Sequence, residues 1–173
     1  MNILHVLSGD FVAGSETSTA ALMEAQIEDG HRVFIASGQF PHPTRAKVFS
    51  IPIYQSGFLS RFSNIRRLIQ IIRDEKIDVV HAHSRAACRV GYWACRFTKT
   101  AYLSTLHGRQ HLHFSNKNFN IYGPRCAVVC ENIREQMLAE TKVFQPEQLV
   151  VVRNGIQMTT SRKLTRINAV LKD

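Results

Sequence analysis

The stretch that decides the fold is Ile77–Gly108, IDVVHAHSRAACRVGYWACRFTKTAYLSTLHG. A short apolar run leads to His83, a helical pattern follows, and a second apolar run, Tyr102–Leu106, leads to His107. Two strands joined by one amphipathic helix form a βαβ unit, which requires parallel strands and a right-handed crossover. Both strands then end at the same edge of the sheet, where open α/β sheets bind ligands. We therefore predict a ligand site that contains His83 and His107.

The flanking sequence repeats this alternation of short apolar runs and helical patterns. We expect further strands at 3–7, 33–36, 48–53, 126–130 and 149–152, and further helices at 17–27, 60–73 and 131–141. The run 48–53 should lie at the edge of the sheet, because Pro52 has no N–H for a central ladder. This order of elements predicts one α/β domain with a parallel sheet.

The composition fits a single globular domain with an anionic partner. The chain has 173 residues, of which 45% are hydrophobic, enough for one well-formed core. It carries 22 Lys and Arg against 13 Asp and Glu, and this surplus suits nucleic acid, anionic lipid or a phosphorylated substrate. The sequence has no helix-turn-helix, zinc or aromatic RNA-binding signature, so we expect no nucleic acid partner.

The cysteines and the N-terminus indicate a reducing compartment. None of the 4 cysteines forms the CxxC pair of a zinc knuckle, so we predict small buried thiols. Residues 1–7 lack the basic region of a signal peptide, and no apolar stretch approaches the roughly 20 residues that span a bilayer. We therefore expect a cytoplasmic protein.

The loop after the first strand, Phe11–Glu16, opens into a helix for which Ser15 is the expected N-cap. Gly14 at this strand-to-helix turn can let a phosphate approach the backbone and the positive end of the helix. The three-glycine dinucleotide fingerprint is absent. Gly14 as a simple turn glycine is the alternative.

The helix expected at 60–73 is both amphipathic and basic. Its apolar face should comprise Phe62, Ile65, Leu68, Ile69 and Ile72, with Arg66, Arg67 and Arg73 largely opposite and Arg61 in the first turn. Such a helix can lie on an anionic membrane surface. It can equally be a crossover helix with a solvated polar face. The two interpretations are compatible, because the apolar side can pack on the sheet while the arginines stay exposed.

A polar loop is expected at 110–120, shortly after His107. His107, His111 and His113 raise the question of a metal site, but no carboxylate or cysteine stands in register with them. We expect a loop that faces substrate and no bound metal.

Four segments in order resemble the N-terminal domain of retaining GT-B glycosyltransferases of family 4, in particular those that build bacterial lipopolysaccharide. They are 13–16 (AGSE, beside the family's GG-x-E), 77–86 (IDVVHAHSRA, beside DVVHAHSRA), 104–108 (STLHG, beside TTFHG) and 152–156 (VRNGI, beside v-x-NGI). The resemblance implies a Rossmann-like, doubly wound, mostly parallel α/β sheet with helices on both faces, the N-terminal half of a GT-B fold.

The resemblance also implies roles for individual residues. His107 is expected as the catalytic residue beside the transferred sugar, where its imidazole can donate a hydrogen bond to a sugar hydroxyl. Gly14, Ser15 and Glu16 are expected on the side of the donor diphosphate or in an acceptor loop. The acceptor or cleft residues are expected to be His83, Ser84, Arg85, Gly108 and His111. From the basic helix at 60–73, and not from the resemblance, we expect Arg61, Arg66, Arg67 and Arg73 to contact anionic membrane.

In this family a second Rossmann-like domain holds the sugar nucleotide, and its motifs do not occur in this sequence. We therefore expect an acceptor-binding domain at 1–156, a linker or tail at 157–173, and activity that needs a C-terminal domain. The partners would be a glycan or lipid-linked acceptor, a sugar nucleotide only in the presence of that domain, and the inner face of the cell membrane. No cofactor is expected besides the sugar nucleotide as co-substrate. The alternative is a non-enzymatic, membrane-associated binding or recruiting module.

Overall fold

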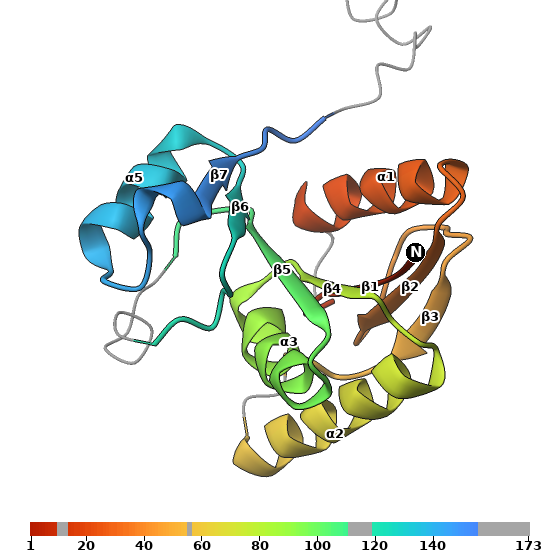
Figure 1. Ribbon diagram of the computed structural model, residues 1–173. Coiled ribbons are helices and arrows are strands. Elements are labelled where there is room, and N and C mark those ends of the chain that lie inside the picture. The colour runs from red at the N-terminus through yellow and green to blue at the C-terminus, as the bar shows by residue number, and fades with distance from the viewer. Residues whose placement is uncertain (10–13, 55–56, 111–118, 156–173) are drawn as a thin grey trace, which may run out of the picture.

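The computed structural model describes residues 1–9, 14–54, 57–110 and 119–155 (Figure 1). The elements are β1 (Asn2–Val6), α1 (Gly14–Glu28), β2 (Arg32–Ser37), β3 (Lys47–Ser50), α2 (Phe58–Asp74), β4 (Val79–Ala82), α3 (Arg85–Thr98), β5 (Ala101–Leu106), β6 (Cys126–Val128), α5 (Glu131–Glu140), a short 3-10 turn η1 (Pro146–Gln148) and β7 (Leu149–Val151). The predicted α/β class and the predicted order of strands and helices are confirmed.

The described strands form one 7-stranded sheet in the order β3-β2-β1-β4-β5-β6-β7, and every neighbouring pair is parallel. β3 is the edge strand, as expected, but it ends at Ser50, before Pro52. β1 lies between β2 and β4, so the chain builds outward from β1 in one direction and from β4 in the other. Such a reversal of strand order leaves a crevice at the carboxyl ends of the two strands.

Helices cover both faces of the sheet, as the doubly wound architecture requires (Figure 1). On one face α1 contributes Met23 to a cluster with Leu7, Val33 and Ile35. On the other face α2, α3 and α5 enclose the larger core; its members from these helices include Leu68, Ile72, Val90, Cys95, Ile133 and Met137. Burial of this apolar surface on both faces supplies the main driving force for folding.

The central βαβ unit has the local features that its sequence predicts. Ser84 is the N-cap of α3, and its Oγ accepts a hydrogen bond of 3.1 Å from the N–H of Ala87. Cys88 and Cys95, one heptad apart, are both buried against the sheet. Lys99 ends the helix in the left-handed conformation with φ of 60°. The cap at Ser84 and the left-handed Lys99 therefore confine α3 to the segment between β4 and β5.

Two local expectations are wrong. Phe62 was expected on the apolar face of α2 but is 56% exposed, because the buried line of the helix runs through Asn64, Leu68 and Ile72. Successive helical residues are about 100° apart, so Phe62 lies on nearly the opposite side from Asn64. Ser15 was expected to cap α1, but the helix already begins at Gly14, and the Ser15 Oγ donates a 2.6 Å hydrogen bond to Oε2 of Glu16.

All four cysteines are free thiols, and three are buried, with Cys130 at an intermediate position. Burial raises the pKa of Cys88, of Cys95 and of Cys126 to about 12, so these thiols stay protonated and unreactive. Among the described helices, none is long and apolar enough to cross a membrane.

Candidate functional site

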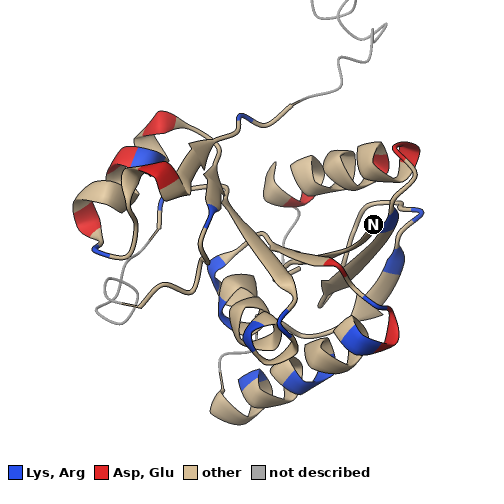
Figure 2. Cartoon of the chain, viewed as in Figure 1, with Lys and Arg blue, Asp and Glu red and all other residues tan. Residues whose placement is uncertain are grey.

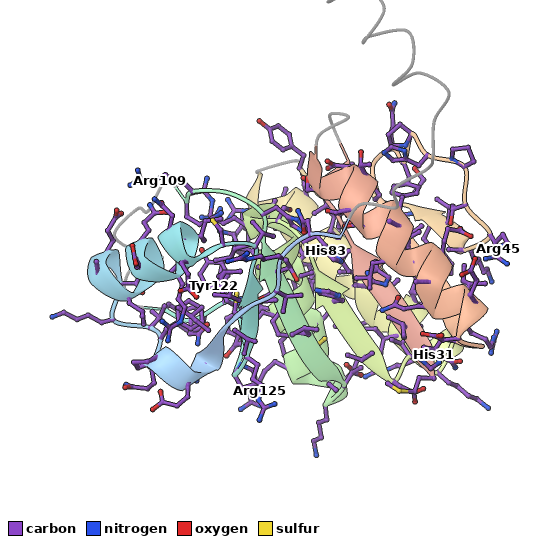
Figure 3. The ribbon with its side chains drawn as sticks, turned by 90° about the horizontal axis from the view of Figure 1, so that it is seen from above. His31, Arg45, His83, Arg109, Tyr122 and Arg125 are labelled. Carbon is purple, nitrogen blue, oxygen red and sulfur yellow. The ribbon has the colours of Figure 1, made fainter. Side chains whose placement is uncertain are left out.

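Four histidines from the centre of the sheet lie close together near its carboxyl edge. His5 in β1 and His81 in β4 are register partners, so their side chains leave the same face of the sheet. His83 directly follows β4, and His107 directly follows β5. Figure 3 shows His83 at the middle of the sheet, far from the peripheral Arg45, Arg109 and Arg125. The predicted meeting of His83 and His107 is confirmed in the geometry.

Hydrogen bonds join three of these imidazoles into a chain. His83 Nε2 lies 2.9 Å from His5 Nδ1, and His83 Nδ1 lies 3.2 Å from His107 Nε2. At the far end, His5 Nε2 lies 2.8 Å from Oε1 of Gln26, which projects from α1. His81 stands beside the chain, with its Nε2 2.7 Å from Oγ1 of Thr105 and its ring centroid 4.0 Å from that of His83. Side chains from α1, from β1 and from the ends of β4 and β5 thus form one row of hydrogen bonds.

Burial keeps these imidazoles neutral. Desolvation lowers the pKa of His5 to about 4 and that of His81 to about 3. The pKa of His83 is lowered well below its usual value by desolvation and then by the neighbouring histidines. Desolvation also lowers the pKa of His107, although the charge of Glu16 opposes that shift. Each ring at neutral pH therefore offers one N–H donor and one lone pair.

The same cluster is the one group of side chains within the described residues that could hold a metal ion. One ligand nitrogen from each of His5, His81 and His83 lies within 4.8 Å of the other two. Neutral imidazoles suit zinc and related ions. However, the close nitrogens of His5 and His83 already share a proton at 2.9 Å, which a metal would have to displace. The expected absence of a metal or cofactor stays a prediction.

A small hollow opens onto these histidines. It has a volume of about 230 Å³ and is lined by His81, His83 and His107 from the sheet, by Thr19 and its neighbours from α1, and by 152–155 after β7. Nδ1 of His107 is buried and has no hydrogen-bond partner among the described residues. An unpaired buried polar atom is costly unless a ligand completes it.

The start of α1 approaches the same edge. Glu16 is buried, at 5% exposure, and close enough to His107 to influence the pKa of that ring. Gly14 is the first described residue of α1, and a Cβ added there would meet no atom of the described residues within 4 Å. Its φ is outside the left-handed region, so neither packing nor backbone conformation requires a glycine here.

A second hollow lies beside Ser84. It has a volume of about 370 Å³ and is lined by Ser8, Tyr54, Ser84, Arg85, Ala86 and Arg89. Partial burial and the neighbouring guanidinium groups of Arg85 and Arg61 lower the pKa of Arg89. Like charges gathered at a concave surface favour an anion there. Figure 2 shows the wider basic surface, with Lys and Arg along α2 and α3.

The predicted site residues thus fall into separate groups. Glu16 lies close enough to His107 for its charge to act on that ring, whereas Ser84 and Arg85 line the second hollow; Gly14 lines neither hollow. Gly108 is exposed at the end of β5, and its carbonyl accepts a hydrogen bond from Gln110 Nε2. His111 lies outside the described residues, as does the expected linker at 157–173.

Sequence reasoning missed Gln26, His5 and His81. The signal for the two histidines was present, because His81 is the one polar residue of β4 and His5 stands between apolar neighbours in β1. A lone histidine in a strand usually forms part of the core, and its partners only appear once strand register is known. For Gln26, in a helix rich in polar residues, the sequence holds no comparable signal.

A family model described as Glycosyltransferase Family 4 matches residues 12–159. The chain belongs to this family.

Solved structures support the family's fold. A glycosyltransferase from Rickettsia africae superimposes with a TM-score of 0.78 and 22% identity, over 99% of this chain and 49% of that one. The lipopolysaccharide outer core galactosyltransferase WaaB gives 0.70 and 15%, over 92% and 47%. Anabaena HepE in complex with UDP gives 0.71 and 14%, over 99% and 50%. A comparison with curated protein sequences found no match. The family 4 chain spans about half the length of these solved structures.

Proposed function

We propose that this family 4 chain is the acceptor-binding half of a retaining GT-B glycosyltransferase. The enzyme would transfer a sugar from a sugar nucleotide to a cell-surface glycan or lipid-linked acceptor. The observation that carries the proposal is the hydrogen bond between His83, which follows β4 at the topological switch point of the sheet, and His107 at the end of the neighbouring β5. Side chains at this place in an open α/β sheet meet the ligand.

The donor would be bound mainly by a second Rossmann-like domain. Support comes from coverage, since the chain spans about half of each similar solved structure, and from HepE, whose structure holds UDP. In the assembled enzyme the start of α1 would face the donor diphosphate. Gly14 leaves space for it, and the N–H groups of the first helical turn suit an anion. His107 would lie beside the transferred sugar.

The acceptor would carry a negative charge. The second hollow collects Arg85 and Arg89, with Arg61 near enough to influence the pKa of Arg89. Guanidinium groups bind phosphate and carboxylate through paired N–H donors. A phosphorylated glycan core or a lipid-linked sugar phosphate satisfies this chemistry. This class of acceptor fits lipopolysaccharide assembly, the process named for WaaB.

We further propose that the enzyme works at the cytoplasmic face of the cell membrane. The first turns of α2 expose Phe58 at 82% and Leu59 at 80%, next to the expected basic residues of that helix: Arg61, Arg66, Arg67 and Arg73. Apolar side chains flanked by arginines suit an anionic lipid surface. Four free thiols are consistent with a reducing compartment.

Transfer assays test the proposal. The chain is joined to a family C-terminal half, and turnover of uridine, guanosine and adenosine sugar nucleotides is measured with phosphorylated glycan acceptors. The variant His107→Ala should lower turnover on the order of a hundredfold, about 3 kcal/mol, and by more than any loss of folded protein accounts for. The matched control is His31→Ala, at the turn before β2.

Two results would contradict the proposal. Specific activity that is unchanged in His107→Ala, once the folded fraction is accounted for, would make His107 a packing residue. No turnover by any assembled pair, together with retained vesicle binding, would favour the non-enzymatic recruiting module.

A further inference from the structure

The side chain of Gln26 begins a hydrogen-bond chain that ends at His107. We infer that Gln26, acting through His5 and His83, fixes the tautomer of His107 and leaves a lone pair on its buried Nδ1, which has no partner among the described residues. Gln26 is thus a positioning residue, in a part of α1 that the sequence did not connect with the site. The inference rests on the proposed function for the identity of the substrate, but the tautomer itself is a property of this chain.

The contact between Gln26 and His5 decides which nitrogen donates in each hydrogen bond of the row. Oε1 of Gln26 can only accept, so the 2.8 Å contact requires the proton on Nε2 of His5. A neutral His5 then has a lone pair on Nδ1, and the proton in the 2.9 Å contact must belong to Nε2 of His83.

The same reasoning carries the direction to the last ring. A neutral His83 has a lone pair on Nδ1, so the proton in the 3.2 Å contact belongs to Nε2 of His107. Nδ1 of His107 is left with a lone pair and no partner among the described residues.

The row of hydrogen bonds from Gln26 to His107 orients His107 and does not conduct protons away from it. A relay needs a terminal group that can take up the transferred proton, and an amide oxygen is a very weak base. A proton passed from His107 through His83 would remain on His5. Burial lowers the pKa of His5 to about 4, so that charge is unfavourable at neutral pH. Each ring therefore keeps its tautomer, and each is held by a neighbour whose own tautomer is fixed.

This result changes the expected chemistry of His107. The sequence-based expectation was an imidazole that donates a hydrogen bond to the sugar. With Nε2–H already given to His83, the remaining ring nitrogen, Nδ1, can only accept. Any ligand group that reaches Nδ1 must therefore be a donor, and a sugar hydroxyl is one such donor.

Nitrogen NMR on the 173-residue protein tests the inference without any activity measurement. With histidine labelled by ¹⁵N, long-range proton–nitrogen spectra separate protonated from unprotonated ring nitrogens, and the signals lost in His107→Gln assign that ring. At neutral pH the wild-type His107 should show a protonated Nε2 and a bare Nδ1. Gln26→Met, which removes the acceptor, should give a mixture of both tautomers.

Two further variants serve as controls. Gln26→Glu should keep the wild-type pattern, because a carboxylate can only accept from His5. Gln70→Met, at an exposed position of α2, should leave all histidine signals unchanged. A chelator should also leave the wild-type spectrum unchanged.

Several outcomes would overturn the inference. A proton on Nδ1 of wild-type His107 would mean that the hydrogen bonds run in the opposite direction. A wild-type pattern in Gln26→Met would show that Gln26 does not set the tautomer. Histidine signals that move on addition of the chelator would show that a metal ion links these rings.

In the assembled enzyme, Gln26→Met should lower kcat at least about tenfold with KM little changed, and Gln26→Glu should restore it. Absence of transferase activity would refute the proposed function and leave the tautomer result standing.

Discussion

Nδ1 of His83 and Nε2 of His107 lie 3.2 Å apart, so one shared proton links the ends of two neighbouring strands. The contact exists because β4 and β5 pair in parallel and end together at one edge of the sheet. Both rings have a lowered pKa, and a second proton in this space would set two donors against each other. The pair is therefore a neutral, preorganised element of the crevice.

This neutrality predicts a loss of stability in acid. The unfolded chain takes up protons on His5, His81 and His83 as the pH falls below about 6.5, whereas the folded chain does not until their lowered pKa values are reached. The stabilisation is complete above about pH 6.5 and is lost as the pH falls toward about 4. Each group should contribute a slope on the order of 1 kcal/mol per pH unit. Urea unfolding at a series of pH values measures it.

The control for this experiment is His81→Leu, which removes one titrating group and should reduce the slope even if it changes the absolute stability. A slope equal to that of the wild type would show that His81 titrates alike in both states. In that case burial would not keep its ring neutral.

The family 4 chain alone should bind sugar nucleotides poorly. In the proposed enzyme the second domain makes most donor contacts, and this chain offers only the start of α1 and the hollow beside His107. Titration calorimetry with uridine, guanosine and adenosine sugar nucleotides should give no tight saturable site. A dissociation constant in the micromolar range, about −8 kcal/mol, would instead make this chain a self-sufficient donor site.

Charge reversal on α2 should release the protein from anionic vesicles. Arg66→Glu with Arg67→Glu should weaken co-sedimentation, because each arginine near a negative surface contributes about 1 kcal/mol. Binding should also fall as salt is raised. Arg125→Glu with Lys142→Glu makes the same change in net charge elsewhere and should have less effect. Equal losses from both pairs would mean that net charge, and not this helix, governs attachment.

Substitution of two glycines by alanine should have opposite consequences. Gly14→Ala should leave stability unchanged or slightly raised, since its Cβ meets nothing, yet lower turnover by crowding the donor diphosphate. Gly123→Ala should destabilise the chain by about 1–3 kcal/mol, because φ is +88° and the Cβ would lie 2.6 Å from Cδ1 of Tyr102. Urea unfolding and transfer assays separate the two effects. Full turnover in Gly14→Ala would remove Gly14 from the donor site.

The central βαβ unit was predictable because its information is local. Apolar runs of strand length, a helical period between them and Ser84 at the N-cap specify β4, α3 and β5. Parallel pairing then brings His83 and His107 to one edge without any further knowledge. The direction in which a helical side chain points was less certain, as the exposed Phe62 shows. There the buried line through Asn64 depends on its hydrogen bond to the carbonyl of Pro52, a tertiary contact.

The sequence by itself therefore determined the parallel α/β fold and the presence of two histidines at the crevice. Only the tertiary structure decided what those histidines can do. The contact between His5 and His83 joins residues 78 positions apart, and the contact between His5 and Gln26 depends on how α1 crosses the sheet. Strand order and helix packing set such distances, and no local pattern encodes them. The proton on His107 is thus assigned by a glutamine whose place in the site exists only once the chain has folded.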